Sequence, residues 1–415
     1  MGSPTESPRV GGPVRLAYVV SHPIQYQAPL LRRIAQEPDI ALTVLYGSDF
    51  SVRGYKDQGF GVDVSWDVPL LDGYISEFLP ALRDTGTVSA SSPISRSLHR
   101  RLMQSDGSPA FDALWVHGYA SVNALQAILA AKRLGIPVLL RAEGWLGDRE
   151  RSAWKLALKQ LFFAALRNGV DAVLPIGTRN GEYWQHYFGD AVPQFMMPYA
   201  VDNDWFARRA AGAAPQAAAL RAELQLEAGR PVILFASKLQ TRKHADHLVA
   251  AYARFIANHA GNAKPYLVIV GDGEERVRLE AQCRELHLDG VRFAGFRNQT
   301  ELPTFFRVAD VFVLPSQHEP WGLIVNEAMA SGCAVIVSSD VGSHVDLVTD
   351  GVEGYVYPVG DITALTQSLS RVLTDSATAR TMGDAARTRM ATWSFEQDVR
   401  GLRAALAHTT GKLNP

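Results

Sequence analysis

The sequence predicts an α/β protein in which two parallel-sheet domains face each other across a cleft. The chain has 415 residues, which is more than one hydrophobic core usually serves. Short β-branched runs alternate with longer segments of helical periodicity, and this alternation is typical of repeated βαβ units. It stops over an alanine-rich stretch at 204–230 and then begins again. Two successive α/β halves follow from this pattern.

The first predicted domain spans residues 14–203. Apolar, β-branched runs predict its strands at 15–21, 41–47, 113–118, 137–143 and 172–177. Apolar residues recur at helical spacing over 121–135 and end at a glycine, so a helix is expected there. Residues 1–13 are polar, and we expect them to form a disordered leader outside this domain.

The second predicted domain spans residues 231–390. Its strands are expected at 231–238, 265–273, 291–296, 311–316, 334–339 and 354–360. The stretch 204–230 is expected to be a linker between the domains with a helix of its own, and 391–415 to contain a terminal helix. Ligands of open parallel sheets bind at the carboxyl ends of the strands, so we expect the functional side chains there.

Composition excludes several classes of protein. Lys and Arg (41) nearly balance Asp and Glu (42), which argues against a general nucleic-acid binder. Two isolated cysteines, Cys283 and Cys333, cannot form a disulfide framework or a cysteine-rich zinc site, and they suit a reducing compartment. The chain shows no signal-peptide core and no run of the roughly 18 apolar residues that a membrane span needs. We therefore expect a cytoplasmic protein.

Two glutamates flank a Pro-Trp-Gly corner in the segment HEPWGLIVNE, residues 318–327. Glu319 follows the predicted strand at 311–316, and Glu327 lies in a predicted helix. The backbone N–H groups of Trp321, Gly322 and Leu323 open that helix, and such N–H groups favour an anion such as a diphosphate. Spacing alone leaves acid/base chemistry, a metal site, sugar binding and no function all open for the two carboxylates.

The same segment resembles the E-x(7)-E signature of the retaining GT-B glycosyltransferases of family 4. The resemblance implies two Rossmann-like domains and a C-terminal helix that crosses back to the N-terminal domain. It also implies that Glu319 holds hydroxyls of the donor sugar and that Glu327 holds the nucleotide ribose. The reaction it implies needs no metal and no cofactor, because the nucleotide sugar is itself a substrate.

Three basic residues follow the first strand of the second half. The segment 235–252 is similar to the family's G-R-L-x-x-x-K-G element, with Lys238 at the arginine position and Lys243 at the lysine position. The resemblance implies that these two side chains, with Arg242 beside them, hold the diphosphate. Ser237 and His244 replace the two glycines. The segment 293–306 matches the family's strand that packs the nucleobase, which places Gly295, Phe296 and Arg297 near the base.

The first half supplies the opposite wall of the predicted cleft. His117 ends a strand in a segment, 112–144, that resembles the family's block in which a histidine contacts the donor sugar near the reacting carbon. His117 joins Lys238, Lys243 and Glu319 as a predicted catalytic residue. We expect His22, Gln25, Tyr26 and Glu143 to contact the acceptor, although a loop at 21–35 that merely packs explains the first three as well.

Two further segments have competing interpretations. Asp202-Asn203-Asp204 has the D-x-D form that metal-dependent GT-A enzymes use, but a helix cap is the favoured interpretation. No other cluster of carboxylates or histidines shows metal-ligand spacing, so we expect no metal site. The basic amphipathic segment 149–169 could touch an anionic membrane weakly or could pack on the first sheet.

The predicted function is metal-independent, retaining transfer of a sugar from a nucleotide-diphosphate sugar. UDP is the favoured nucleotide and GDP the next, and the acceptor is a saccharide, a lipid-linked sugar or a small natural product. The alternatives are a GT-B epimerase or phosphorylase, a dinucleotide-dependent oxidoreductase and a non-catalytic nucleotide-sugar-binding protein. The Gly-Asp-Gly turn at 271–273 lacks the third glycine of a dinucleotide fingerprint, since Arg276 stands there. The oligomeric state does not follow from the sequence.

Overall fold

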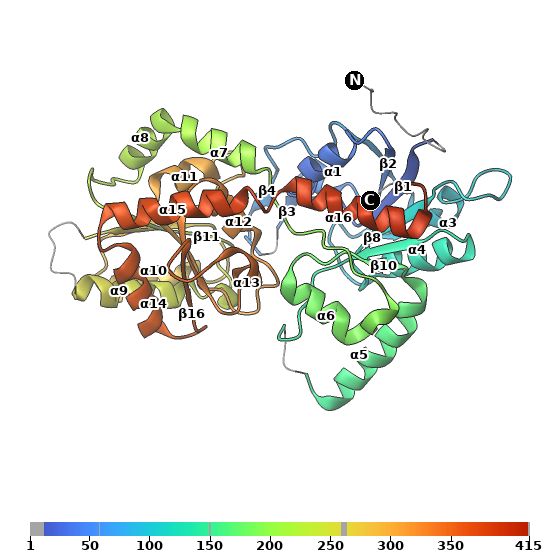
Figure 1. Cartoon of the computed structure of the whole chain (residues 1–415). Helices are drawn as coiled ribbons and strands as arrows, with labels where there is room; N and C mark the ends of the chain where they lie inside the picture. The colour runs from blue at the N-terminus through green and yellow to red at the C-terminus, as the bar shows by residue number, and fades with distance from the viewer. Residues whose placement is uncertain (1–11, 58, 149–150, 259–263, 414–415) are drawn as a thin grey trace, which may run out of the picture.

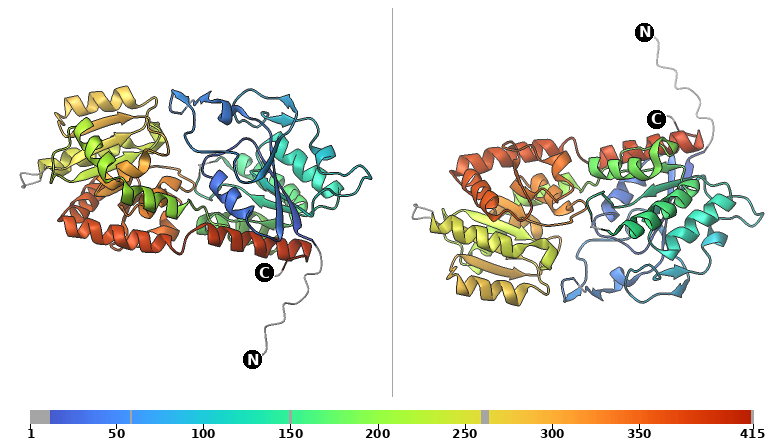
Figure 2. Two further views of the ribbon diagram at one scale, coloured as in Figure 1. Left: turned by 90° about the horizontal axis from the view of Figure 1, so that it is seen from above. Right: turned by 90° about the horizontal axis from the view of Figure 1, so that it is seen from below.

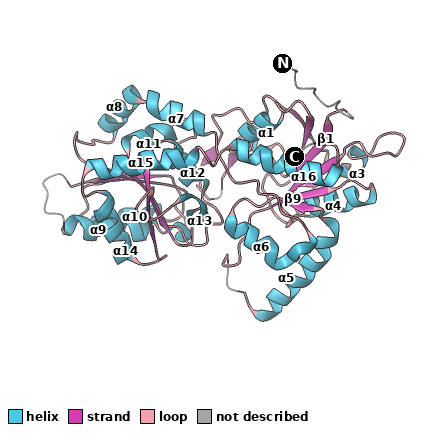
Figure 3. Ribbon diagram, viewed as in Figure 1, coloured by secondary structure: helices cyan, strands magenta, loops and turns pink. Residues whose placement is uncertain are grey.

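The computed structural model describes residues 12–57, 59–148, 151–258 and 264–413. The protein has two α/β domains that lie side by side, each built on one parallel sheet with helices on both faces (Figures 1 and 3). This is the predicted GT-B arrangement. The expected leader at residues 1–13 lies, except for Gly12 and Pro13, outside the described residues.

The first sheet has the strand order β10-β9-β8-β1-β2-β5, and every pair is parallel. Its strands are β1 (Val14–Val20), β2 (Ile40–Tyr46), β5 (Ile75–Phe78), β8 (Ala113–His117), β9 (Val138–Arg141) and β10 (Ala172–Val173). Strands β1, β8 and β9 are buried along nearly their whole length because helices cover both faces, which explains their continuous apolar runs. The sequence predicts five of these strands and misses β5.

Helices and short strands complete the first domain. The helices are α1 (Ala28–Ile34), α2 (Phe50–Arg53), α3 (Leu98–Arg101), α4 (Val122–Arg133), α5 (Ala153–Leu166) and α6 (Thr178–Phe188), with 3-10 turns at Arg167–Gly169 and Gly189–Ala191. Two small antiparallel pairs lie outside the main sheet: β3 (Tyr55–Lys56) with β4 (Asp63–Val64), and β6 (Ala81–Arg83) with β7 (Ile94–Ser95). The β3–β4 hairpin lies between the two domains (Figure 1).

The second sheet repeats the topology of the first, with the order β13-β12-β11-β14-β15-β16. Its strands are β11 (Val232–Ala236), β12 (Tyr266–Val270), β13 (Val291–Gly295), β14 (Val311–Leu314), β15 (Ala334–Ser338) and β16 (Gly354–Tyr357). The helices between them are α9 (Ala245–Ala257), α10 (Arg276–Glu285), α11 (Leu302–Val308), α12 (Leu323–Ala330) and α13 (His344–Leu347), and α14 (Ile362–Val372) and α15 (Ser376–Met390) follow the last strand. In both sheets the strand order reverses beside the first strand, and this reversal is where doubly wound folds bind ligands.

The stretch expected as a linker is more than a connector. It forms α7 (Asn203–Gly212) and α8 (Ala214–Glu223). Phe206, Leu220 and Leu224 are buried in the core of the second domain, where they join residues of β11 and β12. The alanine-rich composition concealed this packing, because few large apolar side chains carry it.

The last helix, α16 (Phe395–Thr410), returns to the first domain and covers one face of its sheet (Figure 2). Its Asp398 accepts a hydrogen bond from Arg141 of β9 at 2.8 Å, and both side chains are buried. Arg141 also donates to the backbone oxygens of Met197 and Pro198 at 2.8 and 2.9 Å. One buried guanidinium thus joins the sheet, the connection between the domains and the terminal helix.

Helix α5 packs on the first domain with one face, as the packing interpretation of 149–169 expects, and exposes apolar side chains on another, as the membrane interpretation expects. It packs through Phe163 and Leu166, which are buried, while Trp154, Leu158 and Leu161 are 57–68% exposed. No helix among the described residues combines the length and the apolar character that crossing a membrane requires. The weak membrane contact stays a prediction.

Candidate functional site

The residues predicted to bind the donor nucleotide sugar lie together where the strand order of the second sheet reverses, between β11 and β14. Lys238 and Lys243 follow β11, and Glu319 follows β14, the neighbouring strand. A backbone hydrogen bond of 2.8 Å from the Gln317 N–H to the Arg242 oxygen ties the two loops. Because the strands are parallel, their carboxyl ends open on the same edge of the sheet, and all three side chains lie at that edge.

Glu319 forms the centre of a cation–carboxylate cluster. Its Oε2 accepts hydrogen bonds from the Lys243 ammonium and, at 3.2 Å, from Arg242 Nη1. Lys243 and Glu319 are buried, whereas the Arg242 side chain is 45% exposed. Burial alone would raise the pKa of the Glu319 carboxyl, but Lys243 and Arg242 outweigh it, and the net pKa is lowered. The carboxylate is therefore charged at neutral pH and can accept hydrogen bonds from hydroxyl groups.

Lys238 is bound by a residue of the opposite domain that the sequence analysis misses. Both carboxylate oxygens of Asp57, next to β3, accept from Lys238 Nζ, at 2.8 and 2.9 Å. The Phe60 ring lies 4.8 Å from the same ammonium and 4.8 Å from the Phe296 ring. Asp57 itself accepts from the N–H groups of Gly59 and Phe60. The hairpin of the first domain thus bridges to the predicted phosphate and base contacts of the second.

The Pro-Trp-Gly corner opens α12 as predicted. Gly322 has φ of +88°, in the left-handed region that favours glycine, and the helix begins at Leu323. The Trp321 side chain is buried, donates to Asn326 Oδ1 at 2.9 Å and stacks on Trp393. Trp321 therefore contributes its backbone rather than its ring to the cleft edge. The Val325 N–H donates to the Gly322 oxygen at 2.8 Å, while the N–H groups of Leu323 and Ile324 precede this first bond of the helix.

Glu327 is buried within α12, and no side chain among the described residues donates a hydrogen bond to it. Burial raises the pKa of its carboxyl to about 8. An isolated buried carboxyl is costly to the fold, and such groups concentrate at functional sites.

We expect Glu327→Gln to stabilise the ligand-free protein, and to do so more at about pH 8 than at about pH 5. Between the ordinary pKa near 4.5 and the folded value of about 8, the folded protein retains a proton that the unfolded chain has lost. Stability of the wild type therefore falls as the pH rises through this range, and the amide removes that fall. Thermal melts of both proteins at the two pH values measure it. An equal gain at both values contradicts the assignment.

The predicted base-contacting residues lie at the end of β13. Gly295 has φ of +70°, and Phe296 meets Phe60 edge to face. Arg297 is bound by Glu223 at 2.5 Å and by Glu301 at 3.2 Å. Contact between Arg297 and a base stays a prediction, and it requires the guanidinium to share or leave these carboxylates.

His117 ends β8 at the reversal point of the first sheet. Both of its ring nitrogens lie 3.3 Å from the Gln27 amide nitrogen, and Gln27 accepts from Tyr18 at 2.7 Å. Burial, with Arg141 nearby, lowers the pKa of His117 to about 3, so the imidazole is neutral. Gln27 belongs to the loop at 21–35 but was not among the predicted site residues, because its buried position beside His117 depends on tertiary packing.

The predicted acceptor residues divide into two groups. Glu143 accepts from the Tyr199 hydroxyl at 2.7 Å, and that hydroxyl lies 3.5 Å from the Tyr26 hydroxyl. Burial raises the pKa of Glu143, and the Glu319 carboxylate across the cleft adds to the rise. Gln25 and Tyr26 also line a pocket of about 300 Å³ beside Trp205. His22 stacks on Phe50 at 4.5 Å and lies near enough to His117 to contribute to the lowering of the His117 pKa.

The D-x-D sequence serves as a helix cap. Asp202 accepts from the Trp205 N–H at 2.8 Å at the start of α7, and Asp204 is exposed. The favoured interpretation of this segment is confirmed.

The sequence is similar to a family of glycosyltransferases and to several of its relatives. Residues 216–389 match the family described as "Glycosyl transferases group 1". An uncharacterized glycosyltransferase of Methanocaldococcus jannaschii is 37% identical over 160 residues, which are 37% of this chain and 39% of that protein. A D-inositol 3-phosphate glycosyltransferase of Salinispora arenicola is 26% identical over 317 residues, covering 72% of this chain and 70% of the relative.

Solved structures of the same fold cover nearly the whole chain. Sucrose-phosphate synthase of Thermosynechococcus elongatus has a TM-score of 0.66 and 21% identity over 94% of this chain and 97% of its own. The Anabaena protein HepE, solved with UDP, has a TM-score of 0.70 and 18% identity over 97% and 100%. The GT-B fold is thus confirmed, and the sequence match to the glycosyl transferases group 1 lies in the second half of the chain, over residues 216–389.

Proposed function

We propose that this protein is a retaining glycosyltransferase that moves a sugar from a nucleotide-diphosphate sugar to an acceptor. The observation that carries the proposal is the buried Glu319 carboxylate held by Lys243 and Arg242 at the reversal point of the second sheet. In this cluster, a carboxylate that can accept hydrogen bonds from sugar hydroxyl groups lies beside cations that can bind a diphosphate.

The donor lies along the second domain in this proposal. Lys238, Lys243 and the N–H groups at Trp321 to Leu323 take the diphosphate, and Glu327 takes the ribose. Gly295 and Phe296 lie near the base. UDP is the favoured nucleotide because the structurally similar HepE was solved with UDP and with UDP-glucose. GDP is the next choice.

The reaction forms a bond from the acceptor oxygen to the anomeric carbon and breaks the bond from that carbon to the diphosphate. The proton of the acceptor hydroxyl passes to an oxygen of the leaving phosphate. Negative charge grows on the diphosphate as the bond breaks, so preorganised cations stabilise the transition state more than the ground state. Lys238, Lys243 and the helix N-terminus supply that charge without a catalytic metal, and neutral His117 faces the sugar from the other domain.

The acceptor binds against the first domain in this proposal. Tyr26, Tyr199 and Glu143 form a hydroxyl–carboxyl chain beside Glu319, which suits recognition of hydroxyl groups. A saccharide, a lipid-linked sugar and a small natural product all present such groups.

Glu319→Ala tests the proposed division of roles. We expect kcat/KM for the nucleotide sugar to fall by about 10- to 100-fold, the effect of one charge-assisted hydrogen bond. The affinity for the free nucleotide diphosphate should change little, since Glu319 is assigned to the sugar. Donor hydrolysis or transfer measures the first quantity and calorimetric titration the second. Parallel losses of both would sink the role assigned to Glu319.

The product anomer tests the stereochemistry. A nuclear magnetic resonance spectrum of the first-formed product should show the anomeric configuration of the donor, and inversion would refute retention. A thermal-shift panel of nucleotides and nucleotide sugars identifies the donor before an acceptor is known.

A further inference from the structure

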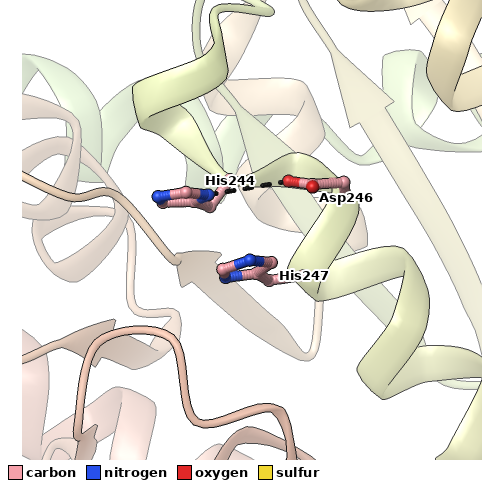
Figure 4. Close-up of side chains that lie close together, drawn as sticks. All are labelled: His244, Asp246 and His247. Atoms are coloured by element: carbon pink, nitrogen blue, oxygen red, sulfur yellow. Dashed lines mark ion pairs between the residues drawn. The ribbon is translucent and has the colours of Figure 1, made fainter.

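Two histidines and an aspartate lie together on the turn that follows Lys243. The ligand atoms of His244, Asp246 and His247 all lie within 4.8 Å of one another, and no other such group occurs among the residues that the structure describes. Figure 4 shows the two imidazole rings face to face and the Asp246 carboxylate beside His244. The rings stack at 4.2 Å with 10° between their planes. The expectation that no cluster has metal-ligand spacing is wrong here.

A left-handed backbone conformation at His244 brings these side chains together. His244 has φ of +49° and ψ of +39°, in the left-handed region, where it ends a 3-10 turn (Thr241–Lys243) and begins α9. A non-glycine residue in this region costs about 1–2 kcal/mol, and the family resemblance places a glycine here. A strained histidine at a functional loop motivates the search for what its ring does.

Two of the three proposed ligands, His244 and Asp246, have an orienting partner on their outer side. His244 Nε2 lies 3.2 Å from Gln317 Oε1, which leaves Nδ1 directed at Asp246 Oδ1, 3.7 Å away. Arg278 binds the other oxygen, Oδ2, at 3.2 Å, so it orients the carboxylate without occupying Oδ1. Outer partners of this kind fix ligands in metal sites.

His247 supplies an independent observation. Its Nδ1 is buried and has no hydrogen-bond partner in the described part of the chain. Buried polar atoms are nearly always hydrogen-bonded, so an unpaired nitrogen beside another imidazole and a carboxylate indicates an absent ligand. Two imidazole nitrogens and one carboxylate oxygen are the donor set of zinc and related transition metals, not of magnesium or calcium.

We propose that His244, Asp246 and His247 bind one transition-metal dication of the zinc class at the start of α9. The site uses none of the residues assigned to the donor, although His244 directly follows Lys243. A bound metal would fix the turn that carries Arg242 and Lys243, and it would tie this turn to Asp246 and His247 in the first turn of α9.

Cobalt is the probe for the test, because a tetrahedral Co²⁺ site with nitrogen ligands absorbs visible light. The metal-stripped full chain should bind one equivalent of Co²⁺ with visible bands, and Zn²⁺ should displace it. His247→Ala should lose at least about 100-fold in Zn²⁺ affinity by competition titration, since removing a ligand costs no less than removing an outer partner. Mg²⁺ should neither displace Co²⁺ nor raise the melting temperature.

His186→Ala is the matched control, because it removes an exposed histidine of α6 outside the cluster. It should bind Co²⁺ as the wild type does. Asp246→Asn gives a second loss of affinity if His247→Ala does not fold. Absence of saturable binding by the folded wild type overturns the proposal, as does binding that both cluster variants retain. A nucleotide thermal shift on the same samples reports on the donor site separately.

Discussion

Lys243→Ala should lower kcat by about 100- to 1000-fold, as the loss of one preorganised transition-state donor commonly does. Lys243 is buried beside Glu319, so no water or mobile side chain readily replaces its charge. Arg242 lies nearby, but its side chain is 45% exposed, and solvent screens its charge more than that of buried Lys243. Steady-state turnover of the nucleotide sugar measures the effect.

Lys264→Ala provides the control, since it removes an exposed lysine from the same domain. Its turnover should match the wild type. Near-wild-type turnover by a folded Lys243→Ala protein would contradict the proposed diphosphate site, and Arg242→Ala would then become the variant to examine.

Asp398→Ala should lower the free energy of unfolding by about 3–5 kcal/mol, the usual effect of leaving one partner of a buried ion pair alone. Its removal leaves the Arg141 guanidinium buried without its carboxylate partner, although the carbonyl groups of Met197 and Pro198 and the Tyr199 ring still contact it. Burial raises the pKa of Asp398 to about 7, so urea unfolding is best followed near pH 8, where the carboxylate is ionised.

Glu396→Ala in the same helix is the matched control. Glu396 pairs with Arg33 at 2.8 Å but is 61% exposed, and exposed pairs contribute about 0–1 kcal/mol. Equal losses in the two variants would show that Asp398 has no special role in holding α16 to the first domain.

Much of the fold follows from local patterns in the sequence. Buried parallel strands are continuous apolar runs, so eleven of the twelve main strands were predictable, and β5 was missed because Ile75 and Phe78 are exposed. The positions of Glu319 and Glu327 also follow from a local segment, since strand end, corner and helix are adjacent in sequence.

The contacts between distant segments could not be predicted in this way. Nothing near Asp57 indicates that it binds Lys238, 181 residues away, because that contact depends on how the domains face each other. Gln27 and His117 meet only through the order of strands β1 and β8. The His244 cluster escapes a spacing rule because its first member lies in a left-handed turn rather than in the helix.

Because Lys238 is paired with Asp57, binding of the donor in the proposed site replaces one anionic partner of Lys238 by another. In the proposed site, the Lys238 ammonium is already paired with the Asp57 carboxylate. An incoming diphosphate must therefore displace Asp57 before it can pair with Lys238. Asp57 belongs to one domain and Lys238 to the other. Under the proposed function, the nucleotide would therefore break one ion pair between the domains as it binds, and the β3–β4 hairpin would lose its contact with Lys238.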